Sequence, residues 1–335
     1  MTRLPVREPV FENRTSMKRT HSAAGGFTLI ELILVIALLA IVSTLAVNKV
    51  GGIREGSARK VSLANQKAVE RAVEAYLAED GALNRLDSLL VAGAGGAPLS
   101  RTAESGAFDF DGASRAGYLY RGPDDDTVRE TRNAGLSDGL RGPLCLYVLD
   151  AGQAAALGSR LGLRFVMAGT AYPDPAFRYG RDRAWGDGTA PESSDGLDPN
   201  AAFCVATAVT NDMPVAAVNP KTNAGRAIYR ACGQELLATE DDGDYDEAAV
   251  LSEVAATGGP LLAFGLGDAA SIVGKADAGL ENAPSAPFAK KTEYSRYILL
   301  VRLRTAAGRT IPEFAGVIDP DGNTFRAAQA VLRNL

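Results

Sequence analysis

The chain has 335 residues, which is enough for one large domain or two. Hydrophobic residues make up 46% and charged residues 22%, a globular composition that excludes a wholly disordered chain. The net charge of −5 argues against a general nucleic-acid binder, which needs a basic surface to neutralise phosphates. Three cysteines without a C-x-x-C pair exclude a disulfide-dense scaffold and give no sign of a zinc site.

The first predicted element is an apolar helix over residues 27–47. Its polar exceptions are Thr28, Glu31, Ser43 and Thr44. A helix of this length spans about 31 Å, the thickness of a bilayer's hydrocarbon core. Basic residues precede the run and favour a cytoplasmic N-terminus with the later chain exported. They are Arg3, Arg7, Arg14, Lys18 and Arg19.

A cleaved secretory signal peptide is the alternative for this run. The apolar core of such a peptide is usually about 7–15 residues long and ends at a small-x-small cleavage site. The run here is longer, and Thr44-x-Ala46 is a poor match to such a site. We therefore expect a membrane-spanning segment.

One acidic residue, Glu31, lies within the apolar run. An ionised carboxylate in hydrocarbon is costly, so an intramembrane acid is a functional candidate by default. The alternative is that Glu31 lies near the helix end, where it reaches headgroup water and gains from the helix dipole. Its position alone does not separate the two.

The residues around Glu31 do separate them. The segment Gly25-Gly26-Phe27-Thr28-Leu29-Ile30-Glu31 follows a basic leader and precedes the apolar run, and it resembles the class III signal of type IV pilins and type II secretion pseudopilins. The resemblance implies cleavage between Gly26 and Phe27 by a prepilin peptidase and N-methylation of Phe27. It also implies that Glu31 is the acid used in assembly. Residues 1–26 would be the leader, or 17–26 if translation starts at Met17.

The chemistry of this arrangement is consistent with assembly. Cleavage would create an α-amine on Phe27, whose reference pKa of about 8 makes it a cation at neutral pH. A carboxylate four residues along is costly to leave unpaired in lipid. The amine of one subunit and Glu31 of its neighbour can neutralise each other when the helices stack with an axial offset.

The helix continues as an amphipathic half over residues 48–80. Apolar residues recur at helical spacing between charged ones. They are Val61, Ala64, Ala68, Val69, Ala72, Val73, Tyr76 and Leu77. Gly51 and Gly52 lie at the junction and can permit a bend, and Gly81 is the expected stop.

The remaining chain, residues 81–335, is predicted to be an exported globular α+β domain. It would be one antiparallel β-sheet, elaborated by long loop insertions and packed on the amphipathic half of the long N-terminal α-helix, which is a pilin-like fold. The strands expected are 117–120, 144–149, 163–168, 201–210, 227–231, 260–266 and 296–304, with 310–318 returning as a hairpin. The helices expected are 244–254 and 324–335.

No cofactor is expected, but one weak calcium candidate stands out. Asp242, Asp244, Asp246 and Glu253 match the ligand spacing of a calcium loop, although Glu247 occupies the position that needs glycine. Capping of a helix explains the aspartates more simply. The segment from Asp319 to Asn323 is similar, with turn residues first and ligands second.

The cysteines allow one disulfide in an oxidising compartment. Cys204 and Cys232 are the candidate pair because both lie in nearby predicted strands, but Cys145 leaves three pairings open. Residues 172–185 combine aromatics with arginines and could form a glycan, DNA or protein contact, or simply a surface loop. An enzyme is disfavoured because the single histidine, His21, would leave with the leader.

The resemblance therefore implies a structural subunit of a type IV pilus or type II secretion pseudopilus, of a size that suggests a minor or tip subunit. The alternatives are a tip adhesin or DNA-uptake subunit using residues 172–185, and a membrane-tethered enzyme. The implied partners are other pilins through the helix, the prepilin peptidase/methyltransferase, the inner-membrane assembly platform and the lipid bilayer before assembly. The implied location is the bacterial inner membrane, single-pass, and then a filament.

Overall fold

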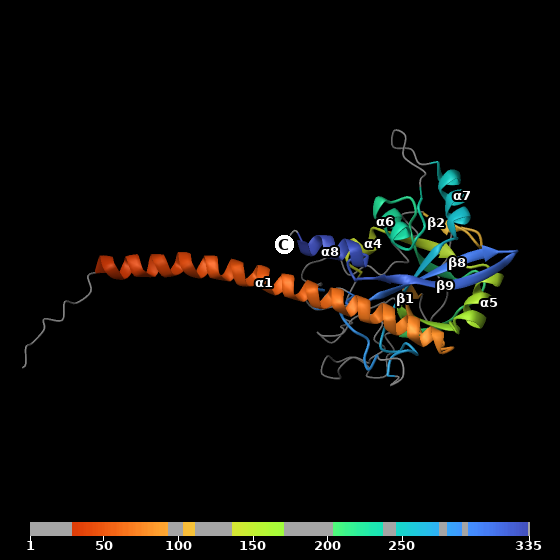
Figure 1. Ribbon diagram of the computed structural model, residues 1–335, viewed down its shortest axis with the longest axis horizontal. Coiled ribbons are helices and arrows are strands. Elements are labelled where there is room, and N and C mark those ends of the chain that lie inside the picture. Colours follow the sequence, from red (N-terminus) through yellow and green to blue (C-terminus); the bar gives the residue numbers. More distant parts are fainter. Residues whose placement is uncertain are drawn as a thin grey trace, which may run out of the picture. The chain divides into compact units, whose positions relative to one another are not determined.

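A long helix and a sheet dominate the computed structural model, which describes residues 29–92, 103–110, 136–170, 204–236, 246–274, 280–289 and 294–333 (Figure 1). Up to residue 54, side chains are described only at Ile33 and Ile36; beyond it, those of 91–92, 168–170 and 204–205 are left out. The chain divides into two compact units, Met1–Gly51 and Gly52–Leu335. The packing reported below lies within the second unit.

Helix α1 extends over Leu29–Ala78 from the first residue that the structure describes, and it ends within two residues of the predicted C-terminal bound. It contains no proline and is rich in alanine, leucine and charged straight-chain residues, which favour helix. Asp80 adopts a left-handed conformation (φ 58°) just after the helix, and the Gly81 amide donates to the Tyr76 carbonyl at 2.9 Å. The helix therefore ends with a left-handed turn made by an aspartate rather than by the expected glycine.

The described strands form one nine-stranded sheet. Its order is β2-β3-β6-β7-β1-β4-β5, with β8 paired to β7 and β9 paired to β8. The strands are β1 Leu86–Ala92, β2 Phe108–Asp109, β3 Leu144–Val148, β4 Phe165–Thr170, β5 Cys204–Ala208, β6 Pro214–Val218, β7 Leu261–Gly265, β8 Ile298–Ala306 and β9 Arg309–Ile318. The α+β class is confirmed, and so is the hairpin of β8 and β9.

The prediction of a wholly antiparallel sheet is wrong, because β1 and β4 are parallel. Parallel neighbours need a crossover connection, and here the chain between them contains β2, α4 (Asp138–Arg141), β3 and α5 (Ala151–Arg160). Helix α5 begins with a capping box in which Asp150 and Gln153 bond each other's backbone amides. The sheet is therefore mixed.

A predicted strand at 227–231 is also wrong, since these residues belong to α6 (Asn223–Ala231). Thr222 caps this helix, and its Oγ1 accepts from the Gly225 amide at 3.0 Å. The adjacent residues Ile228 and Tyr229 are both buried, which a helix on a sheet allows and an alternating half-exposed strand does not. The predicted segment 117–120 lies outside the described residues.

Both faces of the sheet are covered, so the core has two layers. Alternate residues of β3 illustrate this, because Cys145 and Tyr147 belong to one apolar cluster and Leu144 and Leu146 to the other. The first cluster includes α1 and α5, and the second includes α4, α6 and α7 (Glu247–Thr257). Figure 1 shows α6 and α7 across the sheet from α1. All five residues of β3, β6 and β7 are buried as a result.

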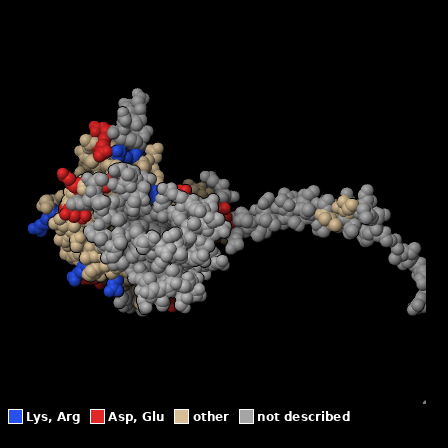
Figure 2. Space-filling view, turned by 180° about the vertical axis from the view of Figure 1, so that it is seen from behind, with Lys and Arg blue, Asp and Glu red and all other residues tan. Residues whose placement is uncertain are grey.

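The chain closes with α8 (Phe325–Arg333), close to the predicted range of 324–335. On the face seen in Figure 2, the described part of the surface carries both basic and acidic side chains rather than one broad patch of either sign.

Candidate functional site

The candidate site is α1, and its N-terminal features lie at the limit of what the structure describes. Gly26 and Phe27 lie outside the described residues. Glu31 lies in the first turn of α1 as the structure describes it, but its side chain is outside the described set. Ile33 and Ile36, three residues apart on the same helix, are 56% and 58% exposed.

Within the described part of the chain, no helix is both long enough and apolar enough to cross a membrane. The predicted spanning segment, residues 27–47, falls almost wholly outside the side chains that the structure describes.

The second half of α1 packs on the sheet through an apolar stretch near its end. Val69 and Val73 are fully buried in the first core cluster. Ala72, Tyr76 and Leu77 are partly buried against the same cluster. This end of the predicted apolar stripe is confirmed.

The beginning of that predicted stripe is wrong. Val61, Ala64 and Ala68 are exposed, and Val61 keeps 50% of its surface in solvent. The residues buried at this level are instead Ser62 and Gln66, at 3% and 1% exposure. Ser62, Gln66, Val69 and Val73 follow one another at steps of four, three and four residues, which places them on one side of a helix.

Ser62 and Gln66 are buried and have hydrogen-bond partners on or beside the sheet, although the Oε1 of Gln66 has none among the described residues. The Tyr297 hydroxyl donates to the Ser62 carbonyl at 2.9 Å and lies 2.9 Å from Ser62 Oγ, which must then be the donor of the second bond. Gln66 Nε2 donates to the carbonyls of Val317 at 2.8 Å and Asn323 at 3.3 Å. Burial raises the pKa of Tyr297 to about 12, so its hydroxyl keeps the proton that this arrangement needs.

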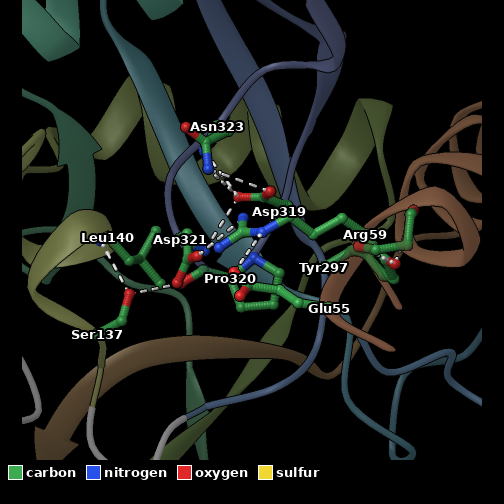
Figure 3. A network of polar contacts seen from close by, with 10 residues as sticks. Glu55, Arg59, Ser137, Leu140, Tyr297, Asp319, Pro320, Asp321 and Asn323 are labelled. Carbon is green, nitrogen blue, oxygen red and sulfur yellow. Dashed lines mark hydrogen bonds and ion pairs between the residues drawn. The ribbon is translucent and has the colours of Figure 1, made fainter. Parts of the chain in front are cut away.

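The loop after β9 receives α1 and is organised by Asp319 (Figure 3). Asp319 Oδ1 accepts from the amides of Asp321 at 3.0 Å and Asn323 at 2.7 Å, and Asn323 Nδ2 lies 3.3 Å from both carboxylate oxygens. The side chain is 2% exposed, and burial raises its pKa to about 6. The Pro320 carbonyl accepts from Ser137 Oγ at 2.7 Å, which ties the loop to the start of α4.

We call the contact of Ser62, Gln66, Val69 and Val73 with the sheet and the loop after β9 the seam. Contacts of the basic residues Arg59 and Lys67 lie beside it along α1. Arg59 lies 3.8 Å from Asp321 and 3.3 Å from Glu55, and its guanidinium lies 5.0 Å from the centre of the Phe288 ring. Lys67 Nζ lies 4.8 Å from the centre of the Phe325 ring. Each such contact near the surface contributes on the order of 1 kcal/mol or less, so geometry rather than strength is what they supply.

This seam is suited to holding a helix in place. Among the residues that the structure describes, no group of three His, Cys, Asp or Glu side chains could hold a metal ion. Sequence reasoning missed Ser62, Gln66 and Tyr297; it singled out Asp319 as a turn residue, which it is, but not its place beside α1. The signal for the first two was the helical spacing that runs back from Val73 and Val69.

The weak calcium candidate is only half described. Asp242 and Asp244 lie outside the described residues. Asp246 is the N-cap of α7, where its Oδ1 accepts from the amides of Ala248 and Ala249 at 3.0 and 3.3 Å. The expectation of a helix capped by an aspartate here is confirmed. Glu253 lies within α7, and calcium binding at these residues stays an untested alternative.

The basis for pairing Cys204 with Cys232 changes. Cys204 opens β5, and its side chain is not described. Cys232 ends helix α6 instead of lying in a strand, and among the described residues it forms no disulfide. Burial raises the pKa of the Cys232 thiol to about 11. The pairing of Cys204 with Cys232 stays a prediction.

The loop of aromatic and arginine residues considered as a contact surface, residues 172–185, lies outside the described residues.

Comparisons with known proteins indicate the family to which the chain belongs. Residues 21–47 match the model of the prokaryotic N-terminal methylation motif. The chain is 30% identical to the prepilin peptidase-dependent protein A of Clostridium perfringens (strain 13 / Type A) over 117 residues, which are 35% of this chain and 81% of that protein. No solved structure matches the chain. The chain therefore belongs to the type IV pilin-like family, whose members carry a prepilin-type N-terminal methylation motif.

Proposed function

We propose that this protein is a structural subunit of a type IV pilus or a type II secretion pseudopilus, cleaved by prepilin peptidase between Gly26 and Phe27 and methylated on Phe27. The observation that carries the proposal is the methylation motif at residues 21–47, which leads directly into α1. The name of the similar Clostridium protein, which refers to dependence on prepilin peptidase, supports the same processing.

The proposed site of assembly is Glu31. The new amine of Phe27 in one subunit and the Glu31 carboxylate of its neighbour would neutralise each other within an apolar surrounding. A buried ion pair of this kind adds little net stability but specifies how two helices align. Before assembly the segment 27–47 would span the inner membrane, with the N-terminus cytoplasmic and the globular unit exported.

We further propose a minor or tip position in the filament. The part aligned with the Clostridium protein is 35% of this chain, so most of the chain is additional to the shared part. A large extra body on each copy is easier to accommodate at an end of a helical filament than at every repeat. The proposed role is structural, because removal of the leader would also remove His21 and leave no imidazole for acid–base chemistry.

The test compares Glu31→Ala with Glu55→Ala, a second acid of α1 that is exposed and lies outside the methylation motif. We expect Glu31→Ala to stay membrane-bound and processed, with loss from sheared filaments. Glu55→Ala should be incorporated like the wild type. Intact mass of the purified protein should show a chain that starts at methylated Phe27. Incorporation of Glu31→Ala at wild-type levels, or a mature chain that starts at Met1, Met17 or Val47, contradicts the proposal.

A further inference from the structure

The stripe that holds α1 on the sheet has two apolar and two polar positions. Val69 and Val73 fill apolar sites in the core, and Ser62 and Gln66 meet polar partners just before β8, on β9 and in the loop that follows β9. The two kinds of position respond differently when the helix slides along its axis.

A slide of α1 by four residues toward its N-terminus leaves the two fully buried apolar positions filled. If α1 moves by four residues toward its N-terminus, Val73 takes the place of Val69 and Leu77 takes the place of Val73. Both fully buried sites then still hold an aliphatic side chain. The opposite slide brings Asn65 to the place of Val69, and an apolar site rejects an amide without partners. The apolar core thus excludes one direction of slide and tolerates the other.

The polar positions exclude the direction that the core tolerates. After the same slide, Gln66 would stand in the place of Ser62, and Glu70 would stand in the place of Gln66. That second place faces the carbonyl oxygens of Val317 and Asn323, which can only accept hydrogen bonds. An ionised carboxylate only accepts hydrogen bonds, so Glu70 would oppose two acceptors in a buried site.

We propose that Ser62 and Gln66 are positioning residues that fix the axial register of α1 on the globular unit. The inference deepens the proposed function: the register has a role in assembly only if the protein is the filament subunit proposed above. The register sets which residues of α1 lie on the sheet, and a slide of four residues moves them by about 6 Å along the helix axis.

Three other features could set the register instead, and the test must remove all of them. The half-buried place of Ala72 would receive the larger Tyr76 after the slide, and the half-buried place of Leu77 would receive Gly81. The short linker from Ala78 to the buried Leu83 would also have to stretch. Replacing Tyr76 by alanine and inserting Leu followed by three Gly/Ser residues directly after Asp80 removes the three restraints.

The experiment measures one distance in the full-length, unassembled chain in detergent micelles. Spin labels are placed at Ala68→Cys on α1 and Arg309→Cys beside the β8–β9 turn, both exposed, with the three native cysteines replaced by alanine. Figure 1 shows this turn farther along the molecule than the C-terminal end of α1, so a slide of α1 toward its N-terminus lengthens the distance. Two variants are compared, and both carry the insertion and Tyr76→Ala. One keeps the native polar positions. The other also carries Ser62→Ala, Gln66→Ser and Glu70→Gln, which moves the serine and the glutamine one turn along the helix.

With the native polar positions we expect the wild-type distance despite the insertion. With the moved positions we expect a longer distance, by up to about 6 Å. A third variant, in which residues 62, 66 and 70 are all alanine, should show both distances, and it serves if the moved variant does not fold.

Lengthening by the insertion alone overturns the proposal, because the linker or Tyr76 then sets the register. The wild-type distance as a single population in either the moved or the all-alanine variant overturns it as well. Since no filament is involved, these results are independent of whether the protein assembles.

Discussion

Asp319 is a buried carboxylate whose titration should be visible in the stability of the protein. Burial raises its pKa from 3.8 to about 6, despite the three N–H groups directed at it. A native state that binds the proton more tightly than the unfolded chain loses stability as the pH rises. The contribution is fully present below about pH 4, falls through about pH 6, and is constant above that.

The size of the effect follows from the shift. About two pKa units correspond to about 3 kcal/mol between the two ends of this range. Asp319→Asn keeps a side-chain oxygen for the backbone amides and removes the charge. The free energy of unfolding of this variant, relative to the wild type, should therefore increase from about pH 4 to about pH 8 by up to about 3 kcal/mol.

The measurement is urea unfolding followed by near-ultraviolet circular dichroism at a series of pH values. Only the difference between variant and wild type matters, because other carboxylates titrate in both. Asp321→Asn, which removes the ion pair with Arg59 from the same loop, is the control for losing a carboxylate there. A difference for Asp319→Asn that is constant with pH, or that falls as the pH rises, refutes the reasoning.

Three further predictions, which use four substitutions, test the packing by chemical unfolding. Val73→Ala should cost about 2 kcal/mol, since it leaves a cavity in the core, whereas Val61→Ala on the exposed side of α1 should stay within about 0.5 kcal/mol of the wild type; equal losses would contradict the assigned face of the helix. Asp150→Ala should cost about 1 kcal/mol through loss of the α5 capping box, and no loss would mean that the cap is not formed in solution. Gly259→Ala should be among the most destabilising changes, because the added Cβ would lie 2.0 Å from the Leu303 carbonyl oxygen at a φ of +91°; a soluble variant of wild-type stability would refute that geometry.

The sequence predicted well where the pattern is local and strong. The long uninterrupted helical pattern predicted α1, whose C-terminal end lies within two residues of the expected one. The apolar runs around 260–266 and 296–304 and the tight turn before 310 gave β7, β8 and β9. Each of these elements is set by its own residues, so no tertiary information was needed.

Prediction failed where partners distant in the chain decide. The parallel pairing of β1 with β4 depends on how β2, α4, β3 and α5 are accommodated between them, which no local pattern states. β1 itself was missed because its residues Asp87 and Ser88 read as polar, although both are buried. Asp87 is accommodated by the Tyr294 hydroxyl, which donates to it at 2.6 Å from more than two hundred residues away.

Partners distant in the chain also explain why the predicted buried side of α1 was wrong at its beginning. Counting apolar residues assigned Val61, Ala64 and Ala68 to the buried side, because polar residues were taken to face water. Ser62 and Gln66 face the sheet because Tyr297, Val317 and Asn323 supply complementary groups there. An apolar residue at either position would bury as much surface but would fit any register that presents an apolar side. Hydrogen bonds require particular atoms to meet, whereas apolar contact does not. Polar residues inside the seam therefore fix the axial position of a long helix on its domain in a way that apolar residues do not.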